Sequence, residues 1–193
     1  MAIGFNPNDM ELTPGILYWQ PHGATASTNL GATLGTIKVA IKTNKAHLLA
    51  DQTGSTPLDS AISGHEFTLT TEMPQTRDYL LASYLFPHAT LEGGTPYDGT
   101  SPSAALQWNN KVGSRDLTVA GMLTMHPQDL PTNNSAYDMT FYVACPTEMS
   151  EIDNGPAKQS TWKVVWTVYP DTANPATSGS NDYRFMRRGN TSF

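Results

Sequence analysis

Alternating hydrophobic and polar residues define most of the regular structure expected in this 193-residue chain. Residues 36–43 read TIKVAIKT, with isoleucine or valine at every second position and Lys38 and Lys42 on the other side. Residues 63–72 alternate in the same way, and their polar side carries Glu66, Thr68, Thr70 and Glu72. Because successive side chains of a strand point to opposite faces, both segments are predicted to be half-buried β-strands.

Three longer segments show the clearest alternation and are expected to supply most of the core. They span 116–126, 138–145 and 161–169. The predicted inward-facing residues are Leu117, Val119, Leu123 and Met125 in the first, Met139, Phe141 and Val143 in the second, and Trp162, Val164, Trp166 and Val168 in the third. Trp162 and Trp166 are predicted to lie on the same side of their strand as Val164 and Val168. This favours packing of the two tryptophans in the core over an exposed platform on which bases or sugars would stack.

Shorter elements complete the pattern. Segments 15–21, 47–51 and 183–188 are typical of short strands. Residues 74–86 are predicted to form the single helix, since Pro74 is tolerated in a first turn and leucines recur at helical spacing.

The remaining segments are expected to be loops and an arm. Glycine, proline, serine and threonine dominate 93–103, and the composition of 170–182 is also that of a loop. Residues 1–13 show little periodicity, so they are predicted to be an N-terminal arm in front of one β-rich domain, 14–193.

Composition narrows the classes of function. Charged residues make up only 15% of the chain, the formal net charge is −6 and the pI is about 5.2. This balance disfavours a protein that grips nucleic acid by neutralising phosphates. The single cysteine, Cys145, alternates with Phe141 and Val143 and is expected to be a buried thiol. Neither a signal peptide nor an apolar run long enough to cross a membrane is recognised, so synthesis in the cytoplasm without a membrane span is expected.

Fragments of three catalytic or metal-binding signatures occur between residues 51 and 66, DQTGSTPLDSAISGHE. Gln52 interrupts the Asp-Thr-Gly turn of an aspartic protease, and Leu69 stands where a zinc metalloprotease needs its second histidine. The oxygen-bearing side chains miss the spacing of a calcium loop. The five histidines lack a recognised ligand spacing, so neither an enzyme nor a cofactor is expected.

The order of segments resembles the major tail tube proteins of long-tailed bacteriophages. LGTIKVAIKT is followed by HLLADQTGSTPLD, then by ISGHEFTLTTEM leading into the helix, and a late strand closes on VYPD. The resemblance covers roughly residues 14–190. The positions that match the family pattern are Asp51-Gln52, Thr56-Pro57-Leu58-Asp59, Gly64, Glu72 and Tyr169-Pro170-Asp171.

The resemblance implies a β-sandwich or barrel-like domain flanked by one α-helix. It also implies six copies in a ring, with rings stacked into a tube through which double-stranded DNA passes. The implied partners are further copies of this chain, the tape measure protein, the tail terminator and baseplate or tail-tip proteins. The implied location is the tail of the virion, after synthesis in the host cytoplasm.

Three groups of residues are predicted to act in such an assembly. A wall of carboxylates and hydroxyls repels phosphate and lets a duplex slide, so Glu66, Thr68, Thr70 and Glu72 are the predicted lumen-facing residues. The polar segment 44–60 is predicted to be an inter-subunit or ring-to-ring loop, with Lys45, His47, Asp51, Gln52, Thr56 and Asp59 as its contacting residues. The basic cluster Arg184, Arg187 and Arg188 is expected to meet an acidic surface of a neighbouring subunit rather than phosphate.

Two other classes of protein fit the same composition. A head-tail connector or capsid decoration protein would form closed oligomers that never polymerise. A carbohydrate-binding β-sandwich would use aromatic side chains such as Tyr18 and Trp108.

Overall fold

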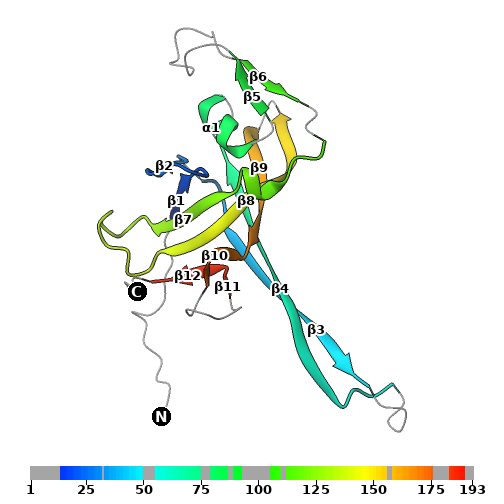
Figure 1. Cartoon of the computed structure of the whole chain (residues 1–193). Helices are drawn as coiled ribbons and strands as arrows, with labels where there is room; N and C mark the ends of the chain where they lie inside the picture. The colour runs from blue at the N-terminus through cyan, green and yellow to red at the C-terminus, as the bar shows by residue number, and fades with distance from the viewer. Residues whose placement is uncertain are drawn as a thin grey trace.

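A computed structural model describes residues 14–31, 33–49, 55–74, 79–86, 89–92, 105–109, 112–155, 158–175 and 183–189. The chain is mainly β, as expected, and most strands join one large antiparallel sheet in the order β2-β1-β7-β8-β9-β4-β3, with β12 pairing with β8 (Figure 1). The strands of this sheet are β1 (Gly15–Gln20), β2 (Thr28–Asn29), β3 (Lys38–Leu48), β4 (Asp59–Met73), β7 (Gly121–Pro127), β8 (Met139–Gly155), β9 (Lys158–Tyr169) and β12 (Met186–Arg188).

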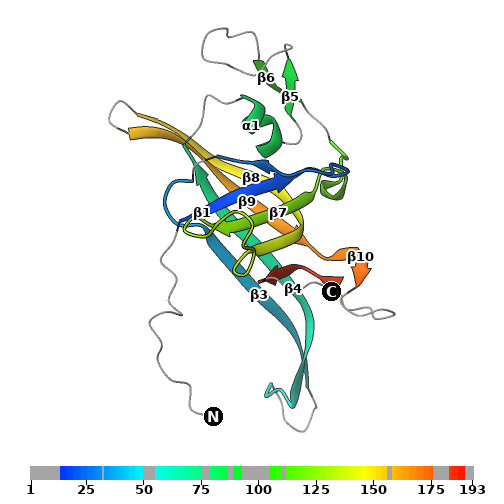
Figure 2. The same ribbon diagram turned by 90° about the vertical axis from the view of Figure 1, so that its left-hand side faces the viewer.

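Smaller elements lie around the large sheet. Strands β5 (Ala89–Glu92) and β6 (Ala105–Trp108) form a hairpin, and β10 (Asp171–Pro175) pairs with β11 (Tyr183–Arg184). The short helix α1 (Tyr79–Leu85) lies beside β5 and β6 at one end of the molecule, while the distal part of β3 and β4 projects from the other (Figures 1 and 2).

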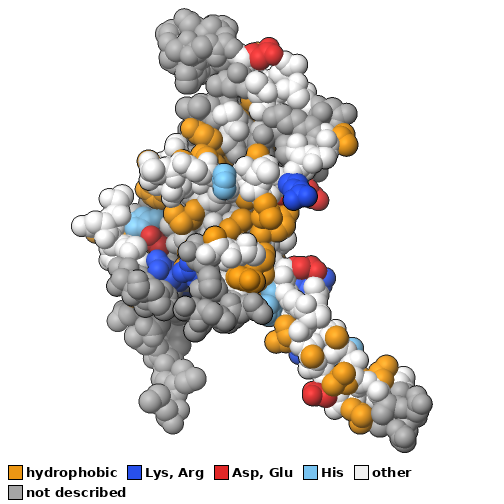
Figure 3. Space-filling view, in the orientation of Figure 1, with side chains coloured by type: hydrophobic (Ala, Val, Ile, Leu, Met, Phe, Trp, Pro, Cys, Tyr) orange, Lys and Arg blue, Asp and Glu red, His pale blue; other side chains and the backbone are white. Residues whose placement is uncertain are grey.

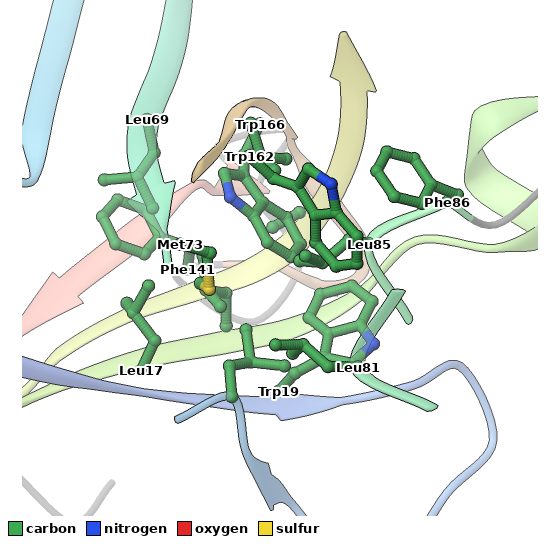
Figure 4. Close-up of a cluster of buried hydrophobic side chains, with 14 of the residues drawn as sticks. Leu17, Trp19, Leu69, Met73, Leu81, Leu85, Phe86, Phe141, Trp162 and Trp166 are labelled. Atoms are coloured by element: carbon green, nitrogen blue, oxygen red, sulfur yellow. The ribbon is translucent and has the colours of Figure 1, made fainter. Parts of the chain in front are cut away.

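Strands β1 and β4 lie near opposite ends of the strand order, yet their side chains meet in one core, so the sheet is strongly curved. Leu17 and Trp19 of β1 and Leu69 of β4 are buried in the same cluster (Figure 4). At its centre the fully buried Trp166 lies 5.1 Å from the Trp19 ring, centroid to centroid. The indole N–H of Trp166 donates to the buried Thr71 hydroxyl at 3.1 Å, which satisfies the two polar groups inside the core.

The helix closes the core at the end opposite the projecting strands. Leu81, Ala82 and Leu85 are buried, and Phe86 meets Trp162 edge to face with ring centroids 5.6 Å apart. The helix predicted over 74–86 is confirmed for Tyr79–Leu85, whereas Pro74 is not helical and residues 75–78 lie outside the described residues.

The alternation in 161–169 is confirmed, because Trp162, Val164, Trp166 and Val168 are all buried. The expected strand at 116–126 is wrong in its first half. Residues Asp116–Thr118 form a 3₁₀ turn, and the strand begins at Gly121. Tyr169 donates its hydroxyl proton to Asp116 at 2.6 Å and holds this turn against the sheet, so Leu117 is 54% exposed.

A close approach of β1 and β7 explains why the strand starts at a glycine. A Cβ at Gly121 would overlap the backbone carbonyl oxygen of Gln20. A side chain here would push β7 away from β1, so only glycine fits.

Several strands were not predicted. Strand β8 extends to Gly155, part of the expected loop 170–182 forms β10, and β5 and β6 lie where no strand was expected. These strands depend on pairing with neighbours rather than on clear alternation, and such pairing is not visible in a single segment.

Removing the Thr71 hydroxyl should destabilise the core. We expect Thr71→Val to leave the Trp166 indole N–H buried without an acceptor and to lower the free energy of unfolding by about 1–3 kcal/mol. Thr68→Val, on the opposite face of the same strand, is the control and should change it by less than about 0.5 kcal/mol. Urea unfolding followed by tryptophan fluorescence measures both, and equal effects would contradict the role assigned to the hydroxyl.

Candidate functional site

The longest feature outside the core is the hairpin of β3 and β4. The two strands pair from Lys38 opposite Thr70 to Leu48 opposite Asp59, with a bulge next to Asn44. Strand β9 pairs with β4 only from Phe67 to Met73. Beyond Phe67 the described strands offer the hairpin no third partner, and it projects from the body (Figures 1 and 2).

The projecting hairpin exposes hydrophobic side chains. Half of the large hydrophobic residues that are exposed in the described part of the chain lie on it, with exposed fractions between 56% and 62%. They are Ile41, Leu48, Leu49, Leu58 and Ile62. Figure 3 shows hydrophobic side chains along the visible side of the hairpin. Clustered exposed apolar side chains mark interaction surfaces, and a two-stranded hairpin gains little stability in water by itself.

The C-terminal strands fasten the root of this hairpin. Phe185 stacks on Phe67 with ring centroids 4.7 Å apart, and His65 lies edge-on to both rings. The carbonyl of Phe185 accepts a hydrogen bond from the Tyr142 N–H at 3.1 Å. The direction in which the hairpin leaves the body is therefore fixed by packing at Phe67.

The polar face of β4 is open, as its alternation predicted. Glu66 is exposed and Thr68, Thr70 and Glu72 are half-buried, whereas Leu69, Thr71 and Met73 on the other side are buried. Cross-strand pairing adds alternate residues of the two neighbouring strands to the same side: Lys38, Ala40 and Lys42 of β3, and Lys163, Val165 and Thr167 of β9. We call the polar side of these three segments the open face.

The open face also carries lysines, which corrects its description as a wall of carboxylates and hydroxyls. Lys42 lies opposite Glu66, and its Nζ is 3.2 Å from the Glu66 Oε2. Lys163 lies opposite Glu72, and Lys38 opposite Thr70. The sequence pattern shows the lysines of β3 but not their register with β4, so the pairing was missed.

Glu66 is the best-held carboxylate of the open face. Asn44 donates a hydrogen bond from Nδ2 to its Oε1 at 2.7 Å. This bond, followed by the hydrogen bond and positive charge of Lys42, lowers the pKa of Glu66 below its ordinary value. The carboxylate is thus held ionised, with a cation beside it.

The predicted loop 44–60 includes the last residues of β3, 44–48, and the first two of β4, 59–60. Lys45 and His47 belong to β3, Asp59 begins β4, and Thr56 lies in the connection. All four side chains are exposed. Asp51 and Gln52 lie outside the described residues. The expected separate strand at 47–51 is therefore wrong, because β3 runs without a break to Leu48.

Arg184, the first residue of the basic cluster, makes contacts within its own subunit. Arg184 reaches Asp171 at 3.5 Å, and its guanidinium lies 4.5 Å from the centre of the Tyr142 ring. Arg187 and Arg188 belong to β12, whose backbone pairs with Thr140 and Met139 of β8. Arg184 therefore acts first as an internal contact, and Arg188 is the exposed member of the cluster.

Cys145 and His126, two side chains that could take part in catalysis, are both buried and have structural roles. Cys145 is fully buried, and burial, followed by the nearby charge of Asp116, raises its pKa to about 12. His126 is buried between Asp138, at 2.6 Å, and the Leu130 carbonyl, at 3.2 Å, and so holds the connection between β7 and β8.

Over the described ranges, no three His, Cys, Asp or Glu side chains gather as metal ligands. No helix there is long and apolar enough to cross a membrane.

Comparison with known proteins gives no further guide. No protein-family model matches the sequence, and no curated protein matches it significantly.

Cys145 should react only after unfolding. At pH 9.5 an ordinary cysteine is mostly thiolate, whereas a thiol with a pKa of about 12 stays protonated. We expect alkylation of the native protein by iodoacetamide to be at least about 100-fold slower than alkylation of the urea-unfolded protein. Mass spectrometry measures both rates, and rapid labelling of the native protein would indicate an accessible nucleophile.

Proposed function

We propose that this protein is the structural subunit of a bacteriophage tail tube. In this proposal six copies form a ring, and stacked rings enclose a channel for genome delivery. The observation that carries it is the hairpin of β3 and β4, which projects beyond the core with exposed apolar side chains. Such a hairpin needs a partner to bury it, and a second copy of the chain is a partner that is always available in a homopolymer.

The position of the hairpin supports contact along the tube axis. Its distal half leaves the body at the end opposite α1 (Figures 1 and 2). If the hairpin of one subunit contacts the body of the next, the contact is head-to-tail. Such a contact can repeat from subunit to subunit without closing, and it then builds a stack. Lys45, His47, Thr56 and Asp59 are exposed on the same hairpin, and we propose them as the polar rim of that contact.

The free edge of β3 supports a second, lateral contact. Within the described residues β3 pairs only with β4, and its 11 residues leave one side of the backbone open to another strand. Exposed edges of this length are usually covered or charged, because they otherwise pair with other chains. Pairing with the next subunit would close the ring and remove the edge, and the open face would then line the channel.

The other proposed partners follow from the assembly. A tube of this kind meets the tape measure protein inside, a terminator at one end and baseplate or tail-tip proteins at the other. The proposed location is the virion tail. The described residues give less support to a carbohydrate site, since Trp108 is 57% exposed but Tyr18 is half-buried against His126.

A charge placed on the hairpin should abolish stacking. We expect the wild-type protein to form tubes or stacked rings at high concentration in negative-stain electron microscopy. Ile62→Asp should lose the tubes, because a carboxylate would be buried in the apolar contact without a partner. Val112→Asp, at a position that is 88% exposed and outside the hairpin, is the matched control and should keep them.

The other outcomes separate the alternatives. Closed rings that never stack would favour a connector or decoration protein. Tubes that survive Ile62→Asp would remove the hairpin from the contact between rings. Loss of tubes in both variants would show that added charge, rather than its position, prevents assembly.

A further inference from the structure

The open face carries cations and anions side by side. Three lysines, Lys38, Lys42 and Lys163, share it with Glu66 and Glu72. On β8, Glu148 lies opposite Val165 and Glu151 lies opposite Lys163. The glutamates at these register positions outnumber the lysines, in line with the net charge of −6 of the whole chain.

We infer that the open face is a concealed duplex-DNA surface, on which glutamates of the same face keep the three lysines from binding phosphate. This inference rests on the proposed function, because it takes the passing genome as the partner. It differs from simple repulsion by a carboxylate wall, since it requires cations and anions to alternate over the surface.

The strand register is what keeps the charges together. Residues directly opposite in an antiparallel pair have Cβ atoms about 4.5–5.5 Å apart. Lys42 is therefore beside Glu66, and Lys163 beside Glu72, even when their flexible ends move. Separations of this size are shorter than the screening length of about 8 Å at physiological salt, so each carboxylate cancels much of its neighbour's field.

The uncharged residues of the face are equally unsuited to binding. Thr68, Thr70 and Thr167 present hydroxyls, and the Thr167 hydroxyl is engaged by Thr147 at 2.9 Å. Strands β3, β4, β8 and β9 contain no arginine, the side chain that holds phosphate with two parallel hydrogen bonds. A duplex meeting this face finds only single-point contacts, each with a competing carboxylate nearby.

Removing the carboxylates should therefore create DNA binding. The test uses the full-length subunit and a fluorescent 20-base-pair duplex, with binding followed by anisotropy at about 20 mM salt, where phosphate contacts are strong. We expect no saturable binding by the wild type. Glu66→Gln combined with Glu72→Gln should bind saturably, with a Kd at least about 10-fold below the highest wild-type concentration tested. The logarithmic salt slope of this binding should approach about −1.8, because Lys38 and Lys42 engage phosphate while Glu151 stays opposite Lys163.

Two controls separate position from net charge. Glu92→Gln combined with Asp129→Asn changes the net charge equally at exposed sites outside the open face and should gain no binding. Adding Lys38→Gln and Lys42→Gln to the first variant should remove the gain. Thermal unfolding of each variant checks that the fold is retained, which we expect because none of these side chains is buried.

Each outcome decides the inference. Wild-type binding as tight as that of the double variant, no gain on removing the carboxylates, or an equal gain in the surface control would overturn it. The assay needs no tube, so its result is independent of assembly. A subunit that gains DNA binding as expected but never stacks would retain the concealed surface and lose the tube proposal.

Discussion

Strand β4 is longer than the core that it helps to build, and the rest of the structure depends on this mismatch. Residues Phe67–Thr70 pair with β9 on one side and with β3 on the other, Thr71–Met73 pair with β9, and the first half of the strand pairs with β3 alone. One strand thus supplies core, open face and projecting hairpin. A slip of one residue would turn Thr70 and Glu72 into the core, so burial of Leu69 and Met73 fixes all three together.

The tryptophan core secures that register with a polar contact as well as apolar packing. Trp166 lies opposite Leu69, and its indole N–H reaches Thr71, two residues further along β4. An indole left without an acceptor in the core would cost free energy, so other alignments of β4 on β9 are disfavoured. The arrangement of charges on the open face is therefore a consequence of packing on the opposite face, which holds Glu72 beside Lys163.

The sequence predicted those parts of the fold in which one strand has a clear inside and outside. The alternation in β9 and the polar side of β4 required no knowledge of their neighbours. The predicted strands 36–43 and 63–72 lie within the hairpin, but its distal part, 44–60, was expected to be a loop. That part lacks a buried side: Leu48 and Leu58 are both exposed, and the bulge next to Asn44 shifts the phase. The charge pairs were missed for a different reason, because they depend on the register between strands. Lys42 and Glu66 lie on consecutive strands, whereas Glu72 and Lys163 lie on strands far apart in the sequence.

Separation of core and hairpin gives the proposed tube subunit a useful property. The apolar residues of the distal hairpin contribute little to the core, so the body gains most of its stability without them. A folded subunit can then wait in solution with its stacking surface uncovered, whereas an obligate dimer would unfold without its partner. The stacking of the Phe185 ring on the Phe67 ring holds the root of the hairpin to the body. The hairpin is therefore preorganised for contact with the next subunit, and less conformational entropy is lost when that contact forms.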